Sequence, residues 1–193
     1  MDVLVLDARW PTQIPLDALG KLGGPVSFTD EVPVSVRWDI DKVVAPEGTG
    51  VLVTTDPATL QRIDDNKQVY IASSISDPVA RAVAAMAAAR RIGEWEARQT
   101  HETLVPFLRE ETDELMEAIG TGVADEMRDE LGDVLLQVLF HAEISPSFSL
   151  SDVAQSIVDK LEKRAPYLFD GTTEMVDEET QHRLWQQGKY SQQ

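Results

Sequence analysis

The chain has 193 residues, of which 42% are hydrophobic and 26% charged, and 34 Asp+Glu outnumber 17 Lys+Arg to give a net charge of −17. It contains no cysteine, which excludes disulfides, thiolate metal sites and cysteine nucleophiles. The acidic balance argues against binding to a nucleic acid polymer, because such binding depends on a basic surface. Neither a membrane span of roughly 20 apolar residues nor a secretory signal is predicted, so we expect a cytoplasmic protein without a membrane partner.

Residues 1–78 predict a small α/β segment. Short apolar runs typical of strands occur at residues 2–7, 50–56 and 68–74, and polar or Pro/Gly-rich connections separate them. Residues 56–64 predict a short helix between the second and third runs. No glycine-rich phosphate loop follows any of these runs, so the pattern assigns no chemistry to this segment.

Residues 79–193 predict a helical domain. The first helix, over residues 77–99, is alanine-rich. The second, over residues 100–119, carries an apolar stripe, has Pro106 in its first turn and stops at the glycines of residues 120–122. Further helices are predicted at 123–144, at 149–164 with a capping box at its start, and at about 177–189. The fold class is therefore α+β with a dominant helical part.

Two acidic groups lie on consecutive predicted helices. Glu110, Glu111 and Glu114 share one face, because residues three or four apart are neighbours on a helix, and Glu130 and Asp133 share another. Between Glu114 and Glu130 lie 15 residues, the spacing of a helical hairpin, so the two groups can face one another. The helix at 123–144 is otherwise mostly apolar beyond residue 133, and Gln137 extends the polar stripe of its two acids.

Carboxylates brought together in this way repel one another. At about 5 Å and an effective dielectric of about 20, each pair of like charges costs roughly 3 kcal/mol. Cations remove that cost, and clustered carboxylates without histidine are hard oxygen ligands suited to Mg²⁺ or Mn²⁺. A di-iron site typically needs two Glu-x-x-His motifs, and only Glu179-x-x-His182 fits. Solvated acidic faces are the ordinary alternative, and we assign Asp125, Glu126 and Asp129 to it.

The pattern E-E-x-x-E at 110–114, followed by E-x-x-D at 130–133, resembles the signature of the all-α nucleoside triphosphate pyrophosphohydrolases. Three longer stretches are similar to the MazG branch: QTHETL (99–104), DELGDVLLQVLFHAEI (129–144) and KLEKRAPYLF (160–169). Trp185, with Lys189 four residues on, matches the terminal element of that branch. The short α/β segment before one such domain resembles the actinobacterial form.

The resemblance implies a helical bundle completed by dimerisation, as a homodimer or a dimer of dimers. It also implies Mg²⁺-dependent hydrolysis of NTPs and dNTPs to monophosphate and pyrophosphate by water attack on the α-phosphorus, with Mn²⁺ as a possible substitute and nucleotide-pool clean-up as the role. The metal ligands implied are Glu111, Glu114, Glu130 and Asp133. Glu110 is the extra acid of the motif, which completes the metal shell or orients the attacking water.

The resemblance also implies a set of substrate-binding residues: Lys160, Arg164, Trp185 and Lys189. Lys160 and Arg164 are one turn apart and suit a diphosphate, although a basic last turn favoured by the helix dipole explains them equally simply. Trp185 can stack on a base or belong to a core. Arg109 and Arg128 flank the acidic motifs. They either reach phosphate or balance charge at the surface, and the sequence favours the surface role.

Three segments depart from the family pattern and leave base selectivity open. Residues 93–96 read Gly-Glu-Trp-Glu where the family commonly has Cys-Pro-Trp-Asp, an often aromatic position holds Asp113, and residues 165–168 lack the family's histidines. For His101 and His141 a helix-interface role is favoured over metal ligation. Two alternatives stay open: an enzyme restricted to dUTP or dCTP, and a noncatalytic helical interaction module with a structural cation site.

Overall fold

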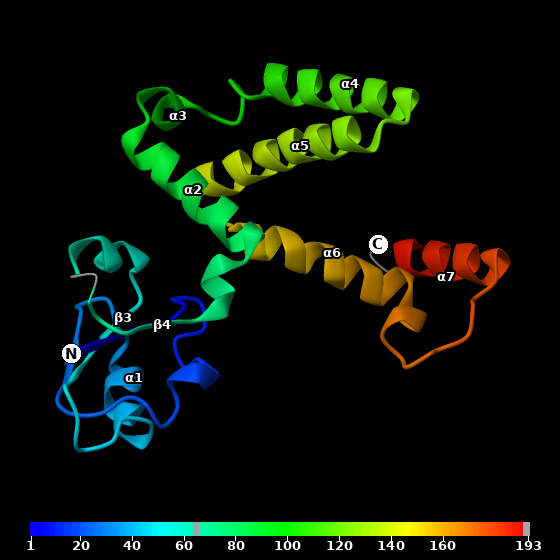
Figure 1. The fold of residues 1–193 in the computed structure, drawn as a ribbon. Coiled ribbons are helices and arrows are strands. Elements are labelled where there is room, and N and C mark those ends of the chain that lie inside the picture. The colour runs from blue at the N-terminus through cyan, green and yellow to red at the C-terminus, as the bar shows by residue number, and fades with distance from the viewer. Residues whose placement is uncertain (64–65, 191–193) are drawn as a thin grey trace. The chain divides into compact units, whose positions relative to one another are not determined.

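The structure is a computed structural model that describes residues 1–63 and 66–190. It divides into two compact units, Met1–Ala82 and Val83–Gln193. Figure 1 shows a strand-containing N-terminal part followed by a run of helices. The α+β fold class is therefore confirmed, and helices dominate it.

The N-terminal unit is built on a four-stranded parallel sheet. The strands are β1 (Asp2–Val5), β2 (Val26–Phe28), β3 (Val51–Thr54) and β4 (Val69–Ile71), in the order β2-β3-β1-β4. Apolar side chains of β1 and β3 are fully buried and pack against the short helix α1 (Val34–Asp39) and the turn after it. Parallel strands need crossover connections, and here α1 and short 3-10 helices lie in those connections.

Three of the four strands were predicted from the sequence, and β2 and α1 were missed. β2 has only three residues and directly follows Gly24 and Pro25, so it lacks a detectable period. The helix predicted at 56–64 is a 3-10 helix over Pro57–Arg62, capped where the Asp56 carboxylate accepts a hydrogen bond from the Ala58 N–H. Residue 64 of that predicted helix lies outside the described residues.

The second unit contains the helices that carry both acidic motifs. Their bounds are α2 (Pro78–Ile92), α3 (Glu94–Arg98), α4 (Val105–Thr121), α5 (Ala124–Ile144), α6 (Leu150–Arg164) and α7 (Glu178–Tyr190). The single helix predicted at 77–99 is wrong in one respect, because Gly93 adopts an extended conformation and separates α2 from α3. None of the described helices combines the length and hydropathy that a membrane crossing requires.

The helix ends follow the predicted signals. Pro106 lies in the first turn of α4, and Gly122 ends that helix in the left-handed conformation, at φ 70°. α4 starts later than predicted because Thr100 and Thr103 form a turn, in which the Thr103 hydroxyl accepts a hydrogen bond from the Thr100 N–H at 2.9 Å. The capping box of α6 is present.

The apolar run of α5 is less buried than its composition predicts. Leu139 and Phe140 are buried, whereas Leu131 is 51% exposed and Leu135 is 41% exposed. Consecutive apolar residues surround a helix on every side, and α4 covers only one side of α5. Trp95 and His101 contact the C-terminal half of α5, whereas Leu131 and Leu135 stay exposed.

Candidate metal centre

The candidate metal centre lies on the α4–α5 hairpin. Gly122 and Val123 alone join the two helices, so α5 returns antiparallel along α4, as Figure 1 shows. This reversal places residues 110–114 of α4 opposite the turn of α5 that carries Glu130 and Asp133. The sequence prediction that the two acidic groups face one another is consistent with this geometry.

Three carboxylates converge in the hairpin. Glu111 and Glu114 of α4 and Glu130 of α5 each offer one oxygen, and these oxygens all lie within 4.8 Å of one another. Glu111 and Glu130 are half-buried, and Glu114 is exposed. The second oxygen of Glu130, Oε2, is buried and has no hydrogen-bond partner. A buried acceptor without a donor is costly, so this oxygen is suited to an external partner.

Two glutamates of the hairpin, Glu111 and Glu130, have a raised pKa. Burial, followed by the charges of Asp133, Glu114, Glu110 and Glu130, raises the pKa of Glu111 above its ordinary value. Burial, followed by Glu114 and Asp133, likewise raises the pKa of Glu130. Within the described residues, none of the salt bridges reaches a carboxylate of this cluster. The excess negative charge is therefore not neutralised by the protein.

Asp133 and Glu110 occupy the edge of this group. Asp133 is half-buried, lies outside the set of three converging oxygens, and is near enough for its charge to raise the pKa of both Glu111 and Glu130. Glu110 is exposed, and its charge contributes to the raised pKa of Glu111. Oxygen donors, an unpartnered buried oxygen and unrelieved repulsion together fit a hard divalent cation such as Mg²⁺ or Mn²⁺.

The predicted cationic residues fall into two groups. On the hairpin, Arg109 is exposed, and Arg128 forms ion pairs with Asp125 at 2.8 Å and with Asp129 at 2.9 Å. The side chains of Arg128 and of both aspartates are mostly solvent-exposed. The structure therefore favours the surface-pairing alternative for Arg128.

The second cationic group lies on α6 and α7. The guanidinium carbon of Arg164 lies 5.4 Å from the ring centroid of Trp185, and its Nε is buried without a hydrogen-bond partner. Lys160, one turn earlier on α6, and Lys189 on α7 are exposed. In the described part of the chain, no hydrogen bond or ion pair is found between this group and the hairpin acids. The protomer brings Arg164 and Trp185 together but does not join them to the metal centre.

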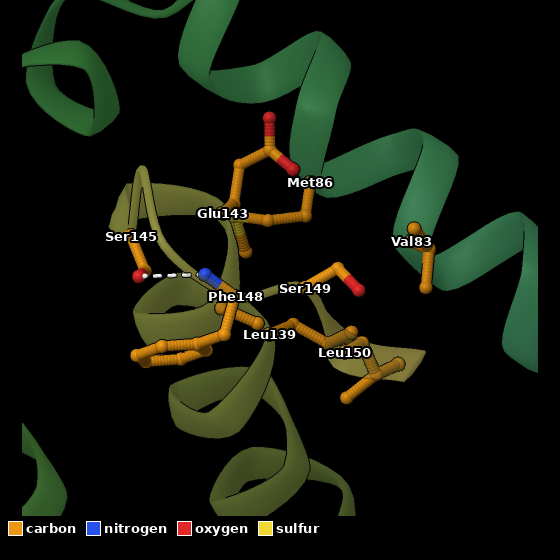
Figure 2. Close-up of a pocket in the computed structure, with 9 residues that line it drawn as sticks. Val83, Met86, Leu139, Glu143, Ser145, Phe148, Ser149 and Leu150 are labelled. Atoms are coloured by element: carbon orange, nitrogen blue, oxygen red, sulfur yellow. Dashed lines mark hydrogen bonds between the residues drawn. The ribbon is translucent and has the colours of Figure 1, made fainter. Parts of the chain in front are cut away.

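A cavity of about 280 Å³ lies at the other end of α5, as Figure 2 shows. Val83 and Met86 of α2 line one wall, and Leu139 and Leu150 contribute to another. The Phe148 N–H donates to the Ser145 hydroxyl at 3.3 Å and holds the rim. None of the hairpin acids lines this cavity, so it is separate from the candidate metal centre.

Several contacts near the hairpin were not predicted. His101 Nδ1 lies 2.8 Å from His141 Nδ1, with the two rings stacked, so the pair joins the segment before α4 to α5. Trp95 makes edge contacts with Phe107 and Phe140. The interface role expected for the histidines agrees with this position. Residues 40 positions apart carry no local signal that would have paired them.

Comparisons with known proteins bear on both units. Residues 99–169 match the profile of the MazG nucleotide pyrophosphohydrolase domain, and residues 1–67 match that of the MazG N-terminal domain. The chain belongs to the MazG family. The MazG domain match contains both acidic motifs of the hairpin together with Lys160 and Arg164, and it ends before Trp185 and Lys189.

Two mycobacterial relatives are each called nucleoside triphosphate pyrophosphohydrolase. The Mycobacterium tuberculosis protein is 38% identical over 204 aligned positions, which cover 99% of this chain and 62% of the relative. The Mycolicibacterium smegmatis protein is 40% identical over 203 positions, which cover 98% of this chain and 62% of the relative. The chain thus spans less than two thirds of the length of these MazG relatives.

A solved structure supports the fold over part of the chain. The crystal structure of a MazG-related protein from Thermotoga maritima superposes with a TM-score of 0.51 at 26% sequence identity. The match covers 57% of this chain and 97% of that protein. The MazG-like fold is therefore supported by sequence and by structure.

Proposed function

We propose that this chain hydrolyses nucleoside triphosphates, NTPs and dNTPs, to the nucleoside monophosphate and pyrophosphate. The observation that carries the proposal is the convergence of Glu111, Glu114 and Glu130 within 4.8 Å without a neutralising partner. The MazG domain match and the names of the mycobacterial relatives support the same reaction class. We further propose nucleotide-pool clean-up as its role.

In the proposed reaction Glu111, Glu114, Glu130 and Asp133 bind Mg²⁺, or Mn²⁺ in its place. The bound cation would supply Lewis-acid chemistry, neutralising phosphate charge and acidifying water. Glu110 lies beside Glu111 and accepts a hydrogen bond from the attacking water, which it orients. The water oxygen bonds to the α-phosphorus, the bond to the bridging oxygen breaks, and pyrophosphate leaves with the electron pair. The water protons pass to the carboxylates and to solvent.

The substrate would contact the group on α6 and α7. Arg164 is suited to bind phosphate oxygens because its Nε is buried and unpartnered and its guanidinium presents a planar fork. Lys160 and Lys189 add positive charge to the same region, and Trp185 offers an exposed ring face for the base. Arg109 and Arg128 are assigned to charge balance. We assign the chemistry to residues 79–193 and none to residues 1–78.

We propose that the active form is a homodimer or a dimer of dimers. Large apolar side chains on α4 and α5 are exposed in the protomer: Met116 58%, Ile119 58% and Leu131 51%. Exposed apolar residues of this density are typical of protein interfaces. A second copy packed on the hairpin would cover them and complete the helical bundle. It would also offer a second α6–α7 pair to the metal centre.

The proposal is tested by pyrophosphate release from a panel of NTPs and dNTPs in Mg²⁺ or Mn²⁺. We expect turnover by the wild type and a loss of at least about 100-fold in Glu114→Gln and Asp133→Asn, because each removes a metal ligand. Asp113→Asn is the matched control, since it removes the same charge from an exposed position of α4. Turnover confined to dUTP or dCTP would select the restricted-enzyme alternative.

Inactivity of the wild type across the whole panel would overturn the proposal. If divalent cations still raised the melting temperature in that case, the noncatalytic interaction module with a structural cation site would replace it. Size measurements of wild type and Leu131→Lys test the dimer separately, since a charge in the exposed apolar stripe should produce monomers.

A further inference from the structure

Gln137 is the buried polar side chain of the helical unit that the proposed chemistry does not use. It is 4% exposed, and its Oε1 is buried with no hydrogen-bond partner among the described residues. The other buried polar side chains, Asp7, Thr54 and Thr55, all lie in the N-terminal unit. Gln137 is therefore distinct in both its position and its lack of partners.

A buried amide without partners is expensive to keep. Leaving one buried acceptor unsatisfied costs about 1–3 kcal/mol, whereas an apolar residue of the same shape is close to neutral. The two residues on either side of Gln137 in the sequence are apolar: Leu135, Leu136, Val138 and Leu139. An apolar residue would suit that stretch better, so the amide indicates a partner that comes from outside the protomer.

The position of Gln137 on α5 indicates which partner this is. It lies one turn beyond Asp133 and two turns beyond Glu130, on the same face as both. Four residues of helix place it about 6 Å along the axis from Asp133. Side chains at this spacing can reach one site, and a neutral amide beside metal-binding carboxylates suits a water molecule at that site. Glu130 Oε2, the other unpartnered buried oxygen of this face, lies on the same stripe.

We propose that Gln137 is a positioning residue of the metal centre. Its amide accepts a hydrogen bond from a water molecule that enters the hairpin together with the divalent cation, and this fixes where that water lies relative to Glu130 and Asp133. Groups that hydrogen-bond around a metal site orient its ligands, and their loss typically weakens metal affinity 10- to 100-fold. The inference rests on the proposed cation site, but it does not require that the chain turn over nucleotides.

The test compares wild type with Gln137→Met, which keeps the length of the side chain and removes the amide. Mn²⁺ alone is the probe, titrated by calorimetry, and unfolding is followed in EDTA. We expect Mn²⁺ affinity to fall about 10-fold, while the melting temperature in EDTA stays equal to or above that of wild type. Gln155→Met on α6 is the control, because that side chain is exposed and bonds only Asp159, at 2.8 Å.

The Mn²⁺ titration decides whether the inference stands, and the unfolding data then say what Gln137 does if it falls. Unchanged Mn²⁺ affinity in Gln137→Met would exclude a role at the metal centre. A lower melting temperature in EDTA with unchanged Mn²⁺ affinity would identify Gln137 as a structural amide, satisfied by a second copy or by ordered water. If the wild type turns over nucleotides, the pH profile of kcat should also shift in Gln137→Met, which a structural amide would not cause. Failure of the hydrolase proposal is seen separately, in wild-type turnover.

Discussion

The two units surround their carboxylates with opposite kinds of neighbour. At the carboxyl ends of the parallel strands, Asp7 accepts hydrogen bonds from the Arg9 guanidinium at 2.7 and 3.0 Å. Glu31 accepts one from the Thr54 hydroxyl at 2.7 Å. In the α4–α5 hairpin, Glu111 and Glu130 have other carboxylates as their principal neighbours.

The pKa directions follow this contrast. Hydrogen bonds from the Arg9 side chain hold the pKa of Asp7 well below its ordinary value. Burial alone would raise the pKa of Glu31, but hydrogen bonds from Thr29 and Thr54 lower it to about 2. Burial and neighbouring charges raise the pKa of both hairpin glutamates. The paired acids therefore stabilise the fold, whereas the unpaired acids destabilise it until a cation binds.

The largest effect is expected from neutralising one hairpin acid. Glu111→Gln should lower kcat at least about 100-fold, since it removes a metal ligand, and should raise the melting temperature in EDTA because a repulsive charge is lost. Kinetics and thermal unfolding of the same preparation measure both. A variant that loses activity and is also less stable in EDTA would contradict the repulsive-cluster account.

Addition of a divalent cation should stabilise the wild type next most strongly. Binding to the folded state alone contributes about 2.7 kcal/mol when the cation concentration is 100 times Kd.

The raised pKa values of Glu111 and Glu130 set the sign of the pH dependence. The hairpin without metal is most stable below the unfolded-state glutamate pKa of about 4.3 and loses that stability as pH rises through the raised folded values. Protons and cations thus compete, so the Mg²⁺-induced shift should be larger at pH 7.5 than at pH 5, and equal shifts would argue against cluster binding.

Removing the paired acid of the N-terminal unit should have the converse effect. Asp7→Asn breaks a charge-assisted pair and should lower the free energy of unfolding by about 2 kcal/mol, while Mn²⁺ affinity stays unchanged. Because the folded pKa of Asp7 is lowered, its contribution is present above the unfolded value of about 3.9 and is lost as pH falls through the folded value. Denaturant unfolding with Mn²⁺ titration checks both. A lower Mn²⁺ affinity in Asp7→Asn would show that the paired acid of the N-terminal unit and the hairpin acids are not independent.

The smallest effect is expected at the histidine pair. Burial, and then the charge of His101, lowers the pKa of His141, so its contribution to stability is present above the unfolded value of about 6.5 and is lost as pH falls toward the folded value. Replacement by glutamine should flatten the dependence of the unfolding free energy on pH between about 7 and 5, because glutamine does not titrate. Chemical denaturation at several pH values measures it, and an unchanged slope in His141→Gln would exclude the pair as its source.

Much of the helical unit could be predicted because its signals are local. Pro106, Gly122 and the Ser149 capping box each mark a helix end by backbone chemistry that a few residues determine. The spacing of Glu114 and Glu130 likewise predicted the hairpin and its acidic face. The break at Gly93 was missed because the alanine-rich run before it has high helix propensity and glycine is tolerated within helices.

Other features depend on contacts that no local pattern encodes. β2 is three residues long and exists because β3 supplies a neighbour for its backbone. The His101–His141 pair and the Trp95 contacts join segments distant in sequence. Gln137 was visible as a polar residue in an apolar run, but its lack of a partner could only be seen once α4 and α5 were placed together.

Hydrolysis in ¹⁸O-labelled water tests the central claim most directly. Wild type is incubated with a nucleoside triphosphate and Mg²⁺. The two products are then separated, and their masses are measured by mass spectrometry. Attack on the α-phosphorus predicts one labelled oxygen in the monophosphate, unlabelled pyrophosphate, and no labelled product with Asp133→Asn. Label in the pyrophosphate, or no hydrolysis by the wild type, would contradict the account.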